Sequence, residues 1–516
     1  MIGDPYPDIG PISVTEPGVQ KLLLNIVESK SSGPDNIPNR LLKELAIELA
    51  PILTSLFNQS LAEGAVPLDW TNANIAPIYK KEDKHLASNY RPVSLTCVCS
   101  KLLEHIVVKH IMDHLDHHTI LTDLQHGFRR NRSCTTQLLM TVADLDSYHD
   151  SNIQVDINIL DFSKAFDVVS HRKLLAKIGH YGIRGNLSHW IASFLTHRTQ
   201  SVVIDGTSST SVPVLSGVPQ GTCLGPVLFL CYINDITQNI KSQLRLFADD
   251  ALLYRPIHSF DDHLILQEDL NALESWAKRW DMQFNPSKCF TMSAKRNGAD
   301  SVFFYTIYNQ ILKCVATQTY LGVLFSDNLS FSNHIGKMCS KTSRTLGFLN
   351  RNLRSCPPKL RELAYTSMCR STLEYASQIW DPYKVSDQDK IERIQRKAAR
   401  FVVRDFRRHT SVTDIMRTLE WEPLTERRKK SRLTLFYQIT NDIVAVPNET
   451  NPYLKQGRRG RYIQIPHKYQ AFQYSFYPRT IKDWNNLKST LESGRVFTSL
   501  FTCSLSHTTF IDPCVF

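Results

Sequence analysis

Two adjacent acidic residues stand between two short apolar runs in the segment LRLFADDALLY. This spacing predicts a tight hairpin with Asp249 and Asp250 at its tip. Neighbouring carboxylates repel each other, and an apolar setting makes their charge more costly. A hard divalent cation such as Mg²⁺ relieves that cost, because it binds carboxylate oxygens and bridges phosphates. An ordinary polar turn, which also favours Asp, is the alternative interpretation.

A third carboxylate, Asp161, ends the alternating segment IQVDINILDF, which predicts a strand. Alternation places Asp161 on the side of Ile157 and Ile159, although a local bulge could turn it away. Asp161 could also be the N-cap of a following helix. If Asp161 meets the acidic pair in space, the three carboxylates could hold two divalent ions roughly 3.5–4 Å apart, the arrangement used for in-line phosphoryl displacement.

Basic and flexible segments would complete such a site. A predicted hairpin is flanked by Lys80, Lys81 and Arg91, which could hold a triphosphate. For any one of these residues taken alone, a position on the solvated surface without a ligand is the better interpretation. The loop SGVPQG would bring Gln220 next to a bound nucleotide or a template base. An ordinary loop before a helix is the alternative for that segment.

Hydrophobic periodicity predicts the elements that must position these residues. We expect helices from about Val19, over Leu41–Leu61, Lys101–His114 and Asn271–Trp280, and directly after SGVPQG. We expect strands over Asn74–Tyr79, Tyr90–Leu95, IQVDINILDF and TYLGVLFS. Beyond about residue 335 the pattern is helical and basic, with 13 Lys/Arg against 6 Asp/Glu in residues 391–432. A mixed unit of strands and helices, followed by a helical unit, is therefore the expected organisation.

Composition narrows the class of protein. The 516 residues carry a formal net charge of +11, which favours a nucleic-acid partner first and an anionic membrane second. The N-terminal segment MIGDPYPDIG lacks signal-peptide features, and no apolar run is long enough to span a bilayer. Twelve cysteines, with Cys97 and Cys99 as the only close pair, show no zinc-ligand spacing. We therefore expect an intracellular protein, nuclear or cytoplasmic, with no membrane partner and no zinc site.

Eight segments, in order, resemble the polymerase region of non-LTR retrotransposons, especially the jockey-like group. They are GPDNIP, NYRPVSL with SKLLEHIV, QHGFRRNRSC, LDFSKAFDVVSHRKLL, LSGVPQGTCLGPVLFLCYINDI, LFADDALL, WDMQFNPSKC and YLGVLFS. They lie between about residues 33 and 330, and FYPRTIKDWNNL is similar to the C-terminal ends of these polyproteins. Each motif alone is weak, and it is their shared order that carries the resemblance.

The resemblance implies an RNA-directed DNA polymerase, a reverse transcriptase. Such an enzyme extends a primer 3′-hydroxyl with dNTPs on an RNA template by nucleotidyl transfer that uses two Mg²⁺ or Mn²⁺ ions. The implied fold is α+β, a right hand of fingers, palm and thumb with a mainly helical C-terminal region. We expect an N-terminal extension (1–32), fingers with the start of the palm (33–152), the palm (153–334), a basic helical thumb (335–432) and a region of uncertain fold (433–516).

The resemblance also implies roles for the acids and for the sugar pocket. Asp161, Asp249 and Asp250 would be the catalytic acids, with Asp161 and Asp249 as the main metal ligands. Phe166 would be the steric gate that excludes a ribose 2′-hydroxyl. A core Phe on the helix after the strand is the alternative reading of Phe166.

Further roles follow in the same way. Gln220 would lie beside the nucleotide, and Lys81 (or Lys80) with Arg91 would hold the triphosphate. Lys288 would protonate the departing pyrophosphate. The predicted strand beginning Tyr320, Leu321 and Gly322 would support the primer end.

Some features depart from the family pattern. Thr222 and Cys223 replace the more usual Ser and aliphatic residue. About 30 residues precede GPDNIP, too few for an endonuclease domain, so we expect this chain to lack one. A catalytically inactive remnant that only binds nucleic acid is the main alternative, against which the complete set of motif residues argues. An intron-encoded maturase shares the palm motifs but not the C-terminal match.

Overall fold

The computed structural model describes residues 4–80, 83–295, 301–448, 451–457 and 460–491. Its centre is a five-stranded sheet with the strand order β12-β9-β3-β8-β7. The strands are β3 (Gln154–Leu160), β7 (Gln243–Phe247), β8 (Asp250–Ile257), β9 (Phe290–Ala294) and β12 (Lys313–Cys314). β3 pairs with β8 and β9, antiparallel to both, and is therefore the middle strand.

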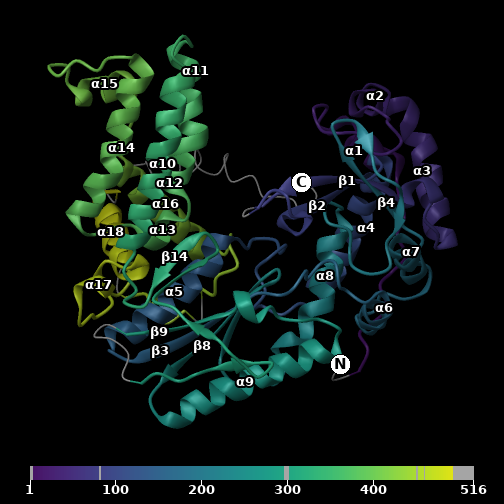
Figure 1. Cartoon of the computed structure of the whole chain (residues 1–516), viewed down its shortest axis with the longest axis horizontal. Coiled ribbons are helices and arrows are strands. Elements are labelled where there is room, and N and C mark those ends of the chain that lie inside the picture. The colour runs from purple at the N-terminus through teal and green to yellow at the C-terminus, as the bar shows by residue number, and fades with distance from the viewer. Residues whose placement is uncertain (1–3, 81–82, 296–300, 449–450, 458–459, 492–516) are drawn as a thin grey trace.

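Helices cover both faces of this central sheet, which explains why β3 is buried along almost its whole length. Helix α5 (Cys134–Asp150) lies on one face, where its Leu138 and Leu145 share a hydrophobic core with Val155 and Ile157 of β3. Helix α9 (Phe260–Arg279) covers the opposite face, as Figure 1 shows at the lower edge of the molecule.

A second sheet lies with the N-terminal helices on the far side of the molecule from the C-terminal helices (Figure 1). Its path is β2-β1-β4-β5, with β6 paired to β4. The strands are β1 (Asn72–Tyr79), β2 (Tyr90–Leu95), β4 (Thr199–Ile204), β5 (Thr207–Ser208) and β6 (Val212–Pro213). The helices are α1 (Glu16–Leu24), α2 (Asn39–Glu44), α3 (Ala46–Glu63), α4 (Val98–His117), α6 (His171–His180), α7 (Gly185–Leu195) and the fully buried α8 (Leu224–Ile233).

The chain after residue 330 is helical, as expected. It forms α10 (Ser332–Asn352), α11 (Pro358–Tyr365), a π-helical turn (Thr366–Arg370), α12 (Ser371–Glu374), α13 (Ser377–Trp380), α14 (Val385–Val403), α15 (Val412–Thr418), α16 (Leu424–Thr440), α17 (Gln470–Gln473) and α18 (Phe476–Leu491). No helix among the described residues is both long enough and apolar enough to cross a membrane.

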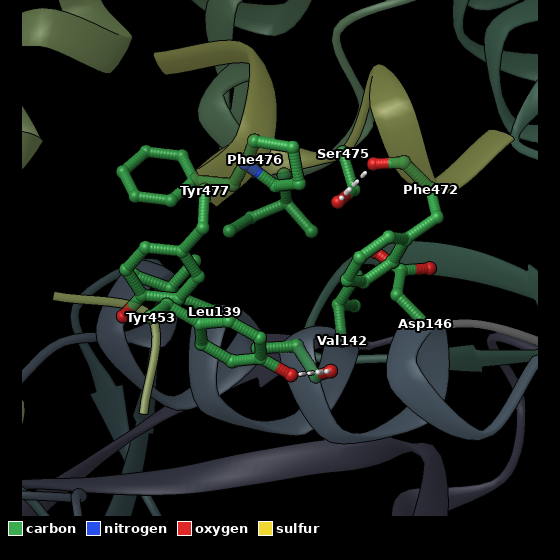
Figure 2. A pocket seen from close by; sticks show the side chains of 11 residues that line it. Leu139, Val142, Asp146, Tyr453, Phe472, Ser475, Phe476 and Tyr477 are labelled. Carbon is green, nitrogen blue, oxygen red and sulfur yellow. Dashed lines mark hydrogen bonds between the residues drawn. The ribbon is translucent and has the colours of Figure 1, made fainter. Parts of the chain in front are cut away.

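The C-terminal region, for which the sequence predicted no fold, packs back onto α5. The carboxylate of Asp150 accepts the backbone N–H groups of Lys468 and Tyr469 at 2.9–3.1 Å. Figure 2 shows Phe472 and Tyr477 facing α5 across a small cavity. This region therefore supports the helix that covers one face of the central sheet.

Two element predictions were wrong. The helix expected over Leu41–Leu61 is broken at Leu45 into α2 and α3, so that each segment turns its own apolar side to the core. The single strand expected at TYLGVLFS is a hairpin of β13 (Thr317–Tyr320) and β14 (Val323–Ser326). Leu321 and Gly322 form its turn, both with positive φ, and a turn of two residues cannot be read from an apolar run.

Candidate active site

Strand register brings the three predicted acids to one edge of the central sheet. Leu160 of β3 pairs with Ala251 of β8. Asp161 follows Leu160 and Asp250 precedes Ala251, so these two acids lie opposite each other. No helix begins at Asp161, because the next one, α6, starts at His171; the N-cap alternative is therefore wrong.

The acidic hairpin differs from its prediction by one residue. Phe247 pairs with Asp250, which leaves Ala248 and Asp249 as the two-residue loop. Ala248 adopts φ 53°, a left-handed conformation that costs a non-glycine residue energy. Asp249 therefore sits in the loop, whereas Asp250 is the first residue of β8.

A residue without a predicted role holds this turn. The buried side chain of Gln125 accepts from Ala248 N (2.8 Å) and from Gly127 N (2.7 Å), and it donates to Ala248 O (3.1 Å). A Cβ atom on Gly127 would lie 2.2 Å from Ala248 N, so this close approach requires glycine. Gln125 and Gly127 belong to the motif QHGFRRNRSC, but only the fold shows which residues they contact.

The carboxyl groups of Asp249 and Asp250 have raised pKa values because they are buried and lie close to other carboxylates. Burial raises the pKa of Asp249, and the charge of Asp161 raises it further, whereas Arg91 and Lys80 lower it. Burial, together with repulsion from Asp249 and Asp161, raises the pKa of Asp250 to about 7. Nearby cations therefore offset only part of the negative charge.

These donors suit a hard divalent cation, which binds carboxylate oxygens and lowers their mutual repulsion. Among the described residues, no three His, Cys, Asp or Glu side chains already close around a point as a metal cage.

Lys288 reaches the acids from the segment that follows α9. Its Nζ lies 3.7 Å from Oδ2 of Asp161. Backbone hydrogen bonds from Asn285 N to Asp161 O and from Ser163 N to Gln283 O, both 2.8 Å, hold the two segments side by side. Lys288 thus lies beside Asp161, and its expected role stays a prediction.

The predicted triphosphate cations come from the second sheet. Arg91 lies on β2 opposite Ile78, and Lys80 follows β1. Both side chains are exposed, and both interact electrostatically with Asp249. Lys81 lies outside the described residues.

The PQG loop lies between the second sheet and the segment after Asp161. Ser94 N of β2 donates to Gln220 O at 2.7 Å. Glu104 of α4 is fully buried and accepts from Cys223 N (2.8 Å) and Leu224 N (3.1 Å) at the start of α8. Glu104 is a second residue of the site for which the sequence predicted no role.

Phe166 stands in a turn, not on a helix as its alternative reading supposed. It is partly buried and stacks on Phe229 of α8, with ring centroids 4.3 Å apart. Tyr320 is buried at the end of β13, where its hydroxyl accepts from Gln137 of α5 at 3.2 Å. The hydroxyl of Tyr375 donates to Leu321 O at 2.9 Å, which ties the β13–β14 turn to the helical region.

An open groove runs between α10 and α14. Four cations, Arg344, Lys390, Arg393 and Lys397, line it together with the small residues Gly336, Ser340 and Ser343. No acidic side chain of the described residues lines this groove. Such a surface suits a phosphodiester backbone.

Residues 78–325 match the family described as "Reverse transcriptase (RNA-dependent DNA polymerase)". This segment is therefore a reverse transcriptase domain. The chain is 30% identical over 416 residues to the probable RNA-directed DNA polymerase from transposon X-element of Drosophila melanogaster. It is 29% identical over 405 residues to the RNA-directed DNA polymerase from mobile element jockey of the same species. These alignments cover 76% and 75% of this chain but 44% of each relative.

A solved telomerase from Candida tropicalis, in complex with a fragment of telomeric RNA, aligns over 72% of this chain and 68% of that chain, with 12% identity and a TM-score of 0.37. The family match and the mixed architecture confirm the expected right-hand polymerase fold. The expected domain boundaries at residues 32, 152, 334 and 432 stay predictions.

Proposed function

We propose that this chain is an RNA-directed DNA polymerase of a non-LTR retrotransposon, which extends a DNA primer with dNTPs on an RNA template. The observation that carries the proposal is the β3–β8 register, which sets Asp161 opposite Asp250 beside the turn of Asp249. Acids from two separate strands at one sheet edge are what nucleotidyl transfer with divalent ions requires. We further propose that the enzyme acts inside the cell, where templates and dNTPs are found.

In this proposal Asp161, Asp249 and Asp250 would hold divalent cations, Mg²⁺ or Mn²⁺. When bound, such ions supply Lewis-acid stabilisation of the charge on the attacking and departing oxygens. Arg91 and Lys80 would bind the triphosphate oxygens from the opposite sheet. Their effect on the pKa of Asp249 supports their facing the same space as the acids.

The remaining residues would orient the nucleotide and move protons. Lys288, beside Asp161, would protonate the departing pyrophosphate. Phe166 would exclude the ribose 2′-hydroxyl, supported from behind by Phe229. The β13–β14 turn would support the primer end, and the groove between α10 and α14 would hold the duplex backbone as the thumb.

Primer extension on an RNA template with dNTPs and Mg²⁺ or Mn²⁺ tests the proposal. The wild type should incorporate nucleotides, whereas Asp249→Asn should lose activity on the order of 1,000-fold. Asp205→Asn, in an exposed turn of the second sheet, is the matched control and should be fully active. Salt-sensitive RNA binding without incorporation by folded wild-type protein would instead support a nucleic-acid-binding remnant.

A further inference from the structure

We infer that Asp167 is a positioning residue that determines which way the side-chain amide of Gln220 faces. The oxygen Oε1 of Gln220 is thereby presented as an acceptor to a hydrogen-bond donor of the bound nucleotide. The inference rests on the proposed function, in which Gln220 lies beside the nucleotide.

A short backbone frame holds the two segments together. Val218 N donates to Phe166 O and Gly217 N donates to Val169 O, both at 2.8 Å. The hydroxyl of Ser216 donates to Asp167 O at 2.9 Å. The loop that carries Gln220 is therefore fixed against the turn that carries Phe166.

Gly217 makes this approach possible. It adopts φ 87°, and a Cβ atom there would lie 2.7 Å from Asp167 O. Only glycine fits such an approach in that conformation. The spacing between the loop and Asp167 is consequently set by the backbone and the Ser216 hydroxyl, independently of the Asp167 and Gln220 side chains.

Within this frame Gln220 Nε2 donates to Oδ1 of Asp167 at 3.0 Å. An ionised carboxylate can only accept, so the amide nitrogen must be the group that faces Asp167. The oxygen Oε1 of Gln220 is then directed away from Asp167. No described residue donates a hydrogen bond to it, whereas the backbone oxygen of Gln220 is already engaged by Ser94.

The consequence is chemical selectivity at the nucleotide. An amide that is free to rotate offers a donor and an acceptor equally often, and it must be ordered when the nucleotide binds. Asp167 orders the amide in advance, which removes that cost from binding. Loss of Asp167 should therefore weaken nucleotide binding while leaving the acids and the nucleic-acid surface intact.

Three variants test this hydrogen bond. In Asp167→Asn, the new amide can either donate or accept, so the orientation of Gln220 is no longer determined. In Gln220→Glu, two carboxylates face each other and repel. In the double variant, the new Asn donates to the new Glu, which restores a hydrogen bond and keeps an oxygen facing the nucleotide.

Steady-state primer extension should show a distinct pattern. We expect Asp167→Asn to raise KM for dNTPs about tenfold, with kcat within about twofold of the wild type and Kd for the template–primer unchanged. The double variant should have a lower KM than Gln220→Glu alone. The exposed control Asp205→Asn should match the wild type. A merely structural role for Asp167 would lower kcat and template–primer affinity as well, and the second substitution would not restore KM.

A wild-type KM in Asp167→Asn, or a double variant no better than Gln220→Glu, would overturn this inference while the wild type remains an active polymerase. If folded wild-type protein incorporates no nucleotide at all, the proposed function fails, and this inference fails with it. The two failures are distinguished by the activity of the wild type.

Discussion

The side-chain amide of Gln125 brackets Ala248, accepting from its N–H at 2.8 Å and donating to its carbonyl oxygen at 3.1 Å. Ala248 is the left-handed residue of the loop that carries Asp249. Gln125 therefore stabilises a strained turn whose geometry sets where a proposed catalytic carboxylate points.

We expect Gln125→Ala to lower kcat on the order of 100-fold, because a small displacement of Asp249 disturbs the alignment of the reacting groups. KM for dNTPs should change little. Primer extension measures both constants, and Gln59→Ala on the exposed side of α3 is the control. Normal kcat in Gln125→Ala would show that the turn holds its shape without this clamp.

Lys288 should contribute to kcat through its proton. Lys288→Ala is expected to lower kcat about 100-fold with KM unchanged, in the range of general-acid effects. Lys288→Arg keeps the charge beside Asp161 but is a poor proton donor, so its kcat should stay low. The exposed Lys278→Ala of α9 should behave like the wild type. Full recovery of kcat by Arg would identify the role as purely electrostatic.

Phe166 should control sugar selection. Phe166→Val is expected to increase rNTP incorporation relative to dNTP incorporation by roughly 10-fold or more, because removing the ring opens space for a 2′-hydroxyl. Competition between the two nucleotide types in primer extension measures the ratio. Phe260→Val, at an exposed site on α9, should leave the ratio unchanged. Unchanged rNTP use with normal dNTP use in Phe166→Val would contradict the gate assignment.

The groove between α10 and α14 should bind nucleic acid through phosphates. Arg393→Ala with Lys397→Ala should weaken RNA–DNA duplex binding and reduce the slope of log K against log salt by roughly 0.9 for each phosphate that is no longer neutralised. Lys21→Ala with Lys30→Ala, which removes the same charge from exposed N-terminal sites, should change the slope much less. Equal effects of the two pairs would indicate that only net charge matters.

His126 should make the fold sensitive to acid. It is buried, and burial together with Arg132, Arg245 and Arg129 lowers its pKa from 6.5 to about 3. Between these values the unfolded chain binds a proton that the folded chain does not. Stability from this group is therefore present above pH 6.5 and falls as pH falls, by about 1.4 kcal/mol per pH unit at most.

Chemical unfolding at pH 7, 6 and 5 measures this linkage. His126→Asn should flatten the pH dependence of the unfolding free energy relative to the wild type. His85→Asn, at an exposed position after β1, should leave that dependence as it is. Parallel pH profiles for the wild type and His126→Asn would show that His126 does not titrate as described.

The sequence by itself determined several local elements and the family resemblance. Apolar runs around Asp249 and Asp250 predicted the β7–β8 hairpin, and the alternation in IQVDINILDF predicted β3. These signals are readable because a strand or a tight turn depends on a few neighbouring residues. The order of the motifs carried the resemblance to reverse transcriptases, which the family match confirms.

Only the tertiary structure decided which of these residues meet. The register that sets Asp161 opposite Asp250 depends on pairing between segments about 90 residues apart, and alternation alone could not exclude a bulge. The hydrogen bonds of Gln125 with Ala248 and of Asp167 with Gln220 join separate motifs in the same way. Strands and buried polar groups must find hydrogen-bond partners, and here those partners come from distant segments of the chain. No local sequence pattern specifies which segments these are.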